Sequence, residues 1–199
     1  YRYTIAWETH EERIREQADH QRAVRRAFMD AEVIIMTVGQ GEIWYDERDG
    51  SVFPVLPPLE VFEPEIHKFR SSTYQENLEN LRRCRALLHE YNPQAHLIIT
   101  TSPVPMKVTF TGENSVVANC AMKSMLRAMV DEFVRESDER VSYFPAYEIV
   151  TQLSVNPLTH DARHVTRETV DVIMQTFERL YVKVDTVAPE IDDSLWEEA

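Results

Sequence analysis

Two residues in the last quarter of the chain, Asp161 and His164, have the types and the spacing of a catalytic acid–base pair. A carboxylate three residues before a histidine can orient the imidazole ring and stabilise its cation when the ring accepts a proton. This chemistry activates a hydroxyl nucleophile. The same pattern also occurs without function near helix starts, where the helix dipole favours a carboxylate. The place of the pair in the fold therefore decides between the two interpretations.

The elements that position this pair can be predicted from apolar patterning. Apolar runs predict strands buried on both faces of a sheet at residues 32–38, 96–101 and 141–149. Apolar residues at helical spacing predict helices at residues 10–31, 73–91 and 119–136, and a last helix capped by Thr166. Such alternation is typical of a mostly parallel sheet covered by helices on both faces. We therefore predict the α/β class with a three-layer α/β/α architecture.

The remaining segments complete the predicted organisation. Residues 1–7 alternate and are rich in aromatic and β-branched types, which predicts a short strand. Residues 43–71 contain several prolines and little periodicity, which predicts a long loop that shapes access to a site. We expect one domain over residues 1–185 and an acidic tail over residues 186–199.

The residues that follow the predicted strands are the next candidates. In parallel sheets the active site lies beyond the carboxyl ends of the strands. Gly39, Gln40 and Glu42 follow the first predicted strand, and Ser102 follows the second. We expect these four residues to line one cleft with His164, or to supply hydrogen-bond donors to an oxyanion.

Three other side chains have a functional and a structural interpretation. Asn119 either contacts substrate or, as we favour, caps the helix predicted to start there. Arg163 either binds a substrate carboxylate or phosphate or forms a surface ion pair, which we favour. Cys120 stands where a helix dipole would lower the pKa of a thiol, but we favour a core or structural role for it.

Ser102 and His160 carry two alternative chemistries. Ser102 follows a strand as a nucleophile would, but Pro103 comes next and no Gly-x-Ser-x-Gly string surrounds it, which favours a turn residue. The spacing of His160 and His164 is similar to the zinc pattern His-Glu-x-x-His. That pattern requires a helix, whereas these residues lie in a predicted loop. We therefore predict neither a metal nor another cofactor.

Composition excludes some classes of binding partner and bears on where the protein is located. The formal net charge of −13 repels phosphate backbones and anionic membranes, so we expect no nucleic-acid partner. No apolar run approaches the roughly 20 residues of a membrane span, and no signal peptide opens the chain. Two cysteines far apart favour a reducing compartment, so we predict a cytoplasmic protein. The chain begins with Tyr1 rather than Met, so a targeting sequence upstream of Tyr1 would not be visible.

Five strings, in this order along the chain, resemble the GSCFA family within the SGNH, or GDSL-type, hydrolases. They are residues 37–44 (TVGQGEIW), 101–105 (TSPVP), 116–120 (VVANC), 143–150 (YFPAYEIV) and 161–166 (DARHVT). The resemblance implies a three-layer, flavodoxin-like fold and Ser-His-Asp ester chemistry. Asp161 and His164 match the late Asp-x-x-His motif residue by residue.

The sequence also departs from the pattern of this family. The nucleophilic serine of the Gly-Ser-Cys-Phe-Ala string has no counterpart here, and we expect it upstream of Tyr1. Gly39 matches the first glycine of the Gly-x-Asn-Asp block of SGNH enzymes. Gly41 occupies the asparagine position of that block and Glu42 the aspartate position, so a side-chain donor to the oxyanion is missing.

We therefore hypothesise an esterase or O-acyltransferase acting on a small-molecule or carbohydrate ester. His164 would be its general base and then acid, Asp161 the orienting carboxylate, and the Gly39 N–H an oxyanion donor, while this chain alone would be inactive. Alternatives are a binding module that keeps the fold without catalysis, and a metal-dependent hydrolase using His160 and His164. The strand at residues 32–38 would have an open edge, which we expect an upstream segment, another chain, a second copy or residues 1–7 to cover.

Overall fold

The structure, a computed structural model, describes residues 8–182, so the strand predicted at residues 1–7 lies outside the described part. The elements along the chain are α1 (His10–Asp30), β1 (Val33–Val38), β2 (Glu42–Asp46), β3 (Val52–Phe53), β4 (His67–Ser71), α2 (Tyr74–Tyr91), β5 (His96–Thr101), α3 (Ser115–Glu136), β6 (Val141–Tyr143), α4 (Ala146–Glu148) and α5 (Arg167–Tyr181). A 3-10 turn at Leu59–Val61 precedes β4, and a π-helical turn at Ile149–Leu153 follows α4.

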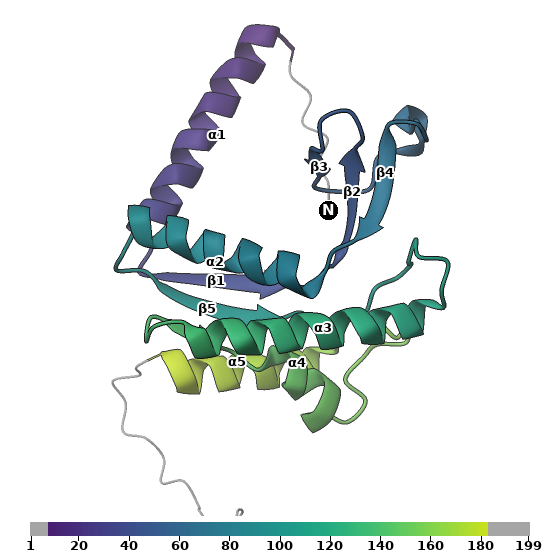
Figure 1. Cartoon of the computed structure of the whole chain (residues 1–199). Helices are drawn as coiled ribbons and strands as arrows, with labels where there is room; N and C mark the ends of the chain where they lie inside the picture. The colour runs from purple at the N-terminus through teal and green to yellow at the C-terminus, as the bar shows by residue number, and fades with distance from the viewer. Residues whose placement is uncertain (1–7, 183–199) are drawn as a thin grey trace, which may run out of the picture.

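The predicted parallel sheet is present, with strand order β1-β5-β6. Helices α2 and α3 cover one face of this sheet, and α4 and α5 lie on the other (Figure 1). Side chains alternate along β5: Leu97 and Ile99 pack towards α2 and α3, whereas Ile98 packs towards α5. A central strand buried on both faces explains the continuous apolar run in the sequence. The three-layer α/β/α prediction is confirmed.

The prediction of a long loop at residues 43–71 is wrong. Strands β2, β3 and β4 form a second, antiparallel sheet in the order β3-β2-β4. Trp44 packs at the centre of an aromatic cluster, with its ring 5.6 Å from Phe62, 5.5 Å from Phe69 and 5.0 Å from Phe110 between centroids. The prolines are confined to the connection between β3 and β4. The cluster provides apolar burial for short strands that show little periodicity.

Two predicted boundaries also differ from the structure. Strand β6 ends at Tyr143 instead of reaching residue 149, because the chain turns at Pro145 into α4. Helix α3 begins at Ser115, four residues before the predicted start, since the Asn114 side chain accepts a hydrogen bond from the Val116 N–H and caps it. Asn119 is therefore inside the helix, and the prediction that it caps α3 is wrong.

Helix α1 is present as predicted, but it does not contribute to the core. None of its residues is buried, and it projects away from the sheet in Figure 1. Its carboxyl end is held by Asn92, whose side-chain amide donates to the carbonyl groups of Phe28 and Ala31 at 2.9 and 2.8 Å. The amphipathic pattern therefore predicts the helix correctly. In the structure, the apolar face of this helix is exposed.

Strand β1 lies at the edge of the parallel sheet. The His96 N–H donates to Glu32 O and the Ser102 N–H donates to Val38 O, so even-numbered residues direct their backbone groups towards β5. Alternate residues point to opposite sides of a strand, so the backbone groups of Val33, Ile35 and Thr37 face away from β5. Within residues 8–182 no strand pairs with that edge. Its coverage by an upstream segment or another chain stays a prediction.

Candidate functional site

The predicted acid–base pair forms one hydrogen-bonded turn just before α5. The His164 ring contacts the Asp161 carboxylate through Nδ1 and Oδ2. The other carboxylate oxygen accepts hydrogen bonds from the backbone N–H groups of Arg163, at 2.9 Å, and His164, at 3.0 Å. The Thr159 hydroxyl donates to the same oxygen at 2.7 Å. Ala162, between the pair, has a left-handed backbone with φ of 53°, so the turn is tightly specified.

These hydrogen bonds set the charge state of Asp161. The backbone N–H of His164, the Thr159 hydroxyl and the His164 ring, in that order of size, hold the pKa of Asp161 well below its usual 3.8. The carboxylate therefore stays ionised and acts as the acceptor for the His164 ring. The His164 side chain is 69% exposed, and its Nε2 atom has no hydrogen-bond partner among residues 8–182. The pair thus presents one unoccupied ring nitrogen.

Arg163 connects this turn to the carboxyl end of β5. Its Nε atom donates to the carbonyl oxygen of Pro105 at 3.2 Å. A bridge between Leu158 and Val165 closes the same turn. Arg163 forms no ion pair within residues 8–182, so our favoured interpretation, a surface ion pair, stays a prediction. The Asp161–His164 turn is held beside the segment that follows Ser102.

Gly39 and Ser102 meet where β1 and β5 end. A Cβ atom built on Gly39 would lie 2.9 Å from the Ser102 Cβ, so only glycine fits without a shift. The Ser102 hydroxyl accepts a hydrogen bond from the Val104 N–H at 3.3 Å, which is a turn interaction. The two residues predicted to share a site are in contact, and the geometry of Ser102 agrees with a turn residue.

Replacing Gly39 by alanine should lower the free energy of unfolding by about 1–3 kcal/mol, because the new methyl group overpacks against Ser102. The backbone angles of Gly39 suit any residue, so the cost is steric. Urea unfolding followed by circular dichroism measures it. The double variant Gly39→Ala with Ser102→Gly removes the clashing atom and should recover most of the loss. An alanine variant as stable as the native protein would contradict the contact.

Lys123 is a residue that the sequence interpretation missed. It projects from α3 into the core with 2% of its surface exposed, and its Nζ donates to the carbonyl oxygen of Gly39 at 3.0 Å. Burial lowers the pKa of Lys123 from 10.5 to about 8. A signal for this burial was present, because Leu126 and Val130, which share its helix face at spacings of three and seven, are also buried.

The remaining predicted residues lie around the same end of the sheet with other partners. The Asn119 side chain accepts a hydrogen bond from the Met106 N–H at 3.0 Å. The Glu42 carboxylate accepts hydrogen bonds from the Thr109 hydroxyl and the Phe110 N–H, so it anchors the loop after β5. Gln40 is exposed, and it forms no hydrogen bond within residues 8–182.

Gly41 is buried and closely packed. Its N–H donates to the sulfur of Met122 at 3.2 Å. A Cβ atom there would lie 3.2 Å from the Ser72 hydroxyl and 3.3 Å from Met122 Cγ. Gly41 and Glu42 also line a hollow of about 290 Å³ between β4 and α3. A larger side chain at residue 41 would have to displace these neighbours.

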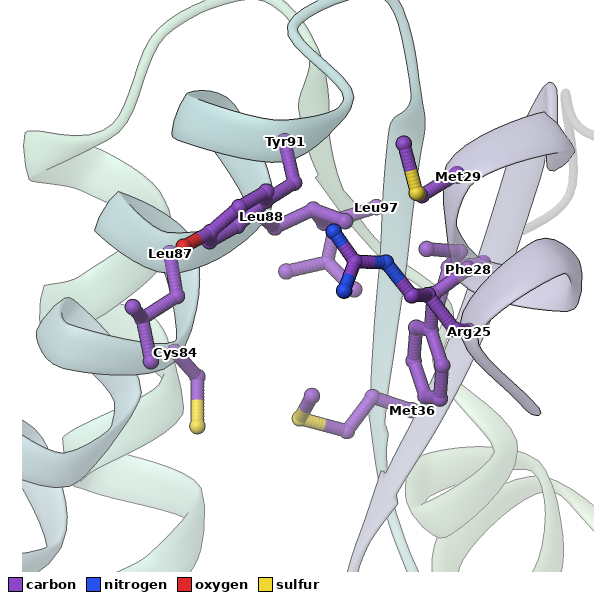
Figure 2. A pocket seen from close by; sticks show the side chains of 10 residues that line it. Arg25, Phe28, Met29, Met36, Cys84, Leu87, Leu88, Tyr91 and Leu97 are labelled. Carbon is purple, nitrogen blue, oxygen red and sulfur yellow. The ribbon is translucent and has the colours of Figure 1, made fainter. Parts of the chain in front are cut away.

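A separate apolar hollow of about 480 Å³ lies between α1, β1 and α2. Figure 2 shows its lining, which includes Phe28, Met36, Leu87 and Tyr91. None of the predicted site residues lines it. It is therefore distinct from the Asp161–His164 turn.

Within residues 8–182, no group of three or more His, Cys, Asp or Glu side chains is arranged to hold a metal ion. In the same range, no helix is both long and apolar enough to cross a membrane. Cys84 and Cys120 are free and exposed, so the prediction of a core role for Cys120 is wrong.

Comparison with known proteins adds a family assignment. No curated protein matches the chain. The model of the GSCFA family matches residues 2–177, a range that contains every predicted site residue and all elements of the parallel sheet up to most of α5. Since this match covers most of the 199 residues, the chain belongs to the GSCFA family.

Proposed function

We propose that this chain supplies the histidine and the carboxylate of a serine-type ester hydrolase or O-acyltransferase of the SGNH type. The observation that carries the proposal is the Asp161–His164 pair, in which Nδ1 is bound to the carboxylate and Nε2 has no partner among the described residues. An imidazole in this state can accept a proton at Nε2 while the carboxylate stabilises the resulting cation.

The chemistry follows from these roles. The Nε2 atom of His164 would take the proton of a serine hydroxyl as its oxygen attacks the ester carbonyl. The protonated ring would then return that proton to the departing alkoxide, leaving an acyl-serine. Transfer of the acyl group to water makes the protein a hydrolase, and transfer to another hydroxyl makes it a transferase. The substrate would be a small-molecule or carbohydrate ester, and no cofactor is part of the proposal.

The nucleophile in this proposal is a serine outside residues 1–199. Ser102 is a poor candidate because its hydroxyl accepts a turn hydrogen bond and its Cβ is packed against Gly39. The open edge of β1 offers a place for a further parallel strand, whose carboxyl end would lie next to Gly39. Pairing of that edge would also satisfy the backbone groups of Val33, Ile35 and Thr37, which face away from β5.

A fluorophosphonate probe tests the proposal, since it reacts covalently with activated serines. The protein is prepared with its full amino-terminal sequence, and the labelled peptide is identified by mass spectrometry. We expect one labelled serine in the added sequence, and no labelling of residues 1–199 expressed alone. Labelling of Ser102 would reassign the nucleophile to this chain. No labelling of either form would reject a serine enzyme.

A binding module without catalysis is the second candidate. It is favoured by Gly41, which leaves the asparagine position of the block without a side-chain donor. This candidate predicts that the full-length protein neither reacts with the probe nor hydrolyses esters. The free, exposed cysteines fit a reducing compartment, so a cytoplasmic location remains part of the proposal.

A further inference from the structure

The hydrogen bond from Lys123 to Gly39 orients a peptide group at the carboxyl end of β1. The Lys123 side chain is buried, and among residues 8–182 its ammonium group forms a hydrogen bond to the Gly39 carbonyl oxygen alone. Burying a cation with one neutral acceptor destabilises a fold compared with an apolar residue of similar size. Such a residue breaks the local rules of core composition, and departures of this kind concentrate at functional sites.

The orientation of the Gln40 N–H follows from peptide geometry. The carbonyl of Gly39 and the N–H of Gln40 belong to one planar trans peptide, so they point in opposite directions. Since the carbonyl points to Lys123 inside the core, the N–H points away from α3. It forms no hydrogen bond within residues 8–182. A positively charged donor on the carbonyl polarises the peptide and strengthens the N–H as a donor.

This N–H lies at the same end of the sheet as the acid–base pair. Gly39 touches Ser102, and the segment that begins there reaches Pro105, whose carbonyl oxygen binds the Arg163 side chain. Arg163 immediately precedes His164. The oriented peptide and the histidine are thus connected through residues 102–105 and Arg163.

We propose that the Gln40 N–H is an oxyanion donor and that Lys123 is the positioning residue that aims it. The proposal rests on the ester chemistry proposed above. The Gln40 N–H would replace the side-chain amide donor of an asparagine at position 41, which is glycine in this chain. As negative charge develops on the carbonyl oxygen of the ester, the fixed N–H stabilises it without reorganisation.

Substitution of Lys123 tests the positioning role in the full-length protein with a chromogenic ester. Lys123→Met should lower kcat by roughly 10-fold or more and change KM by less than about 3-fold, because the donor acts on the transition state. Lys123→Arg, which keeps a cationic donor, should recover part of kcat. Lys68→Met is the matched control, since Lys68 also donates to a backbone carbonyl at 3.0 Å but does so on the surface of β4. That control should leave kcat unchanged.

Substitution of Gln40 tests the donor itself. Gln40→Pro removes the N–H, and Gln40→Ala removes the side chain while keeping the N–H. We expect kcat of the proline variant to be roughly 100- to 1,000-fold below that of the alanine variant. Because Gln40 is exposed and outside β1, this comparison remains decisive even if Lys123→Met does not fold.

The outcomes separate this inference from the proposed function. A full-length native protein without ester hydrolysis would overturn both. An active native protein whose kcat is unchanged by Lys123→Met would overturn the positioning role alone. Equal kcat for Gln40→Pro and Gln40→Ala would overturn the donor assignment, whereas the predicted losses with nearly constant KM would support both roles.

Discussion

Replacing His164 by alanine should lower kcat for ester hydrolysis by the full-length protein by at least about 10,000-fold. The ring is the only group of the proposed site with an unoccupied basic nitrogen next to a bound carboxylate, so its loss removes both proton transfers. KM should change little, because the proton moves only in the chemical steps. Stability should also change little, since the side chain is 69% exposed. Steady-state kinetics and urea unfolding measure the two effects.

His160→Ala is the matched control for this variant. His160 lies in the same exposed turn region and makes no hydrogen bond or ion pair among the described residues. If His164 acts as a general base, His160→Ala should retain kcat. A metal-dependent hydrolase using both histidines would instead lose activity in both variants and recover it with added zinc. Unchanged hydrolysis in His164→Ala would contradict the acid–base assignment.

The parallel sheet was predictable from the sequence because burial on both faces leaves a direct signature. The run from Leu97 to Ile99 is apolar at every position, and the structure places its alternate side chains in two separate cores. The cap at Thr166 was equally direct, since its hydroxyl accepts a hydrogen bond from the Thr169 N–H. Local signals of this kind do not depend on distant parts of the chain.

The second sheet was not predictable because its stability comes from distant contacts. Trp44 packs against Phe110, a residue from the loop that follows β5, and Glu42 anchors that same loop. Neither contact leaves a periodic pattern in residues 42–71. Tertiary packing therefore overrides the weak strand preference of this segment. A role for it in substrate access stays a prediction.

The candidate site likewise has one part that the sequence predicts and one part that it does not. Asp161 and His164 lie three residues apart in one turn, so sequence spacing alone indicates their contact. Lys123 and Gly39 are far apart in the chain, and lysine is rarely found in a core. Nothing in the residues around Gly39 indicates a cation beneath its carbonyl. That contact depends on how α3 lies relative to the end of β1, which no local sequence pattern indicates.

Replacing Asp161 by asparagine should lower kcat by roughly 10,000-fold while leaving the fold intact. The amide oxygen can keep the hydrogen bonds that Oδ1 accepts from the Arg163 and His164 backbone. The amide nitrogen would replace Oδ2 and donate to Nδ1 of His164. Since Nδ1 would then be the acceptor, the ring proton would move to Nε2, and the ring could no longer accept a proton from serine.

Two comparisons separate this tautomer effect from a structural one. Asp161→Ala should also lose kcat, but it should unfold at lower urea concentration, because it removes the bonds that hold the left-handed backbone at Ala162. The native protein should show no change in kcat attributable to Asp161 between pH 4 and pH 9, because its pKa is held below 3.8 and the carboxylate is ionised throughout that range. An asparagine variant with near-native kcat would mean that His164 does not depend on the carboxylate. The pair would then be a structural turn, since an orienting carboxylate is what distinguishes a catalytic histidine from an exposed one.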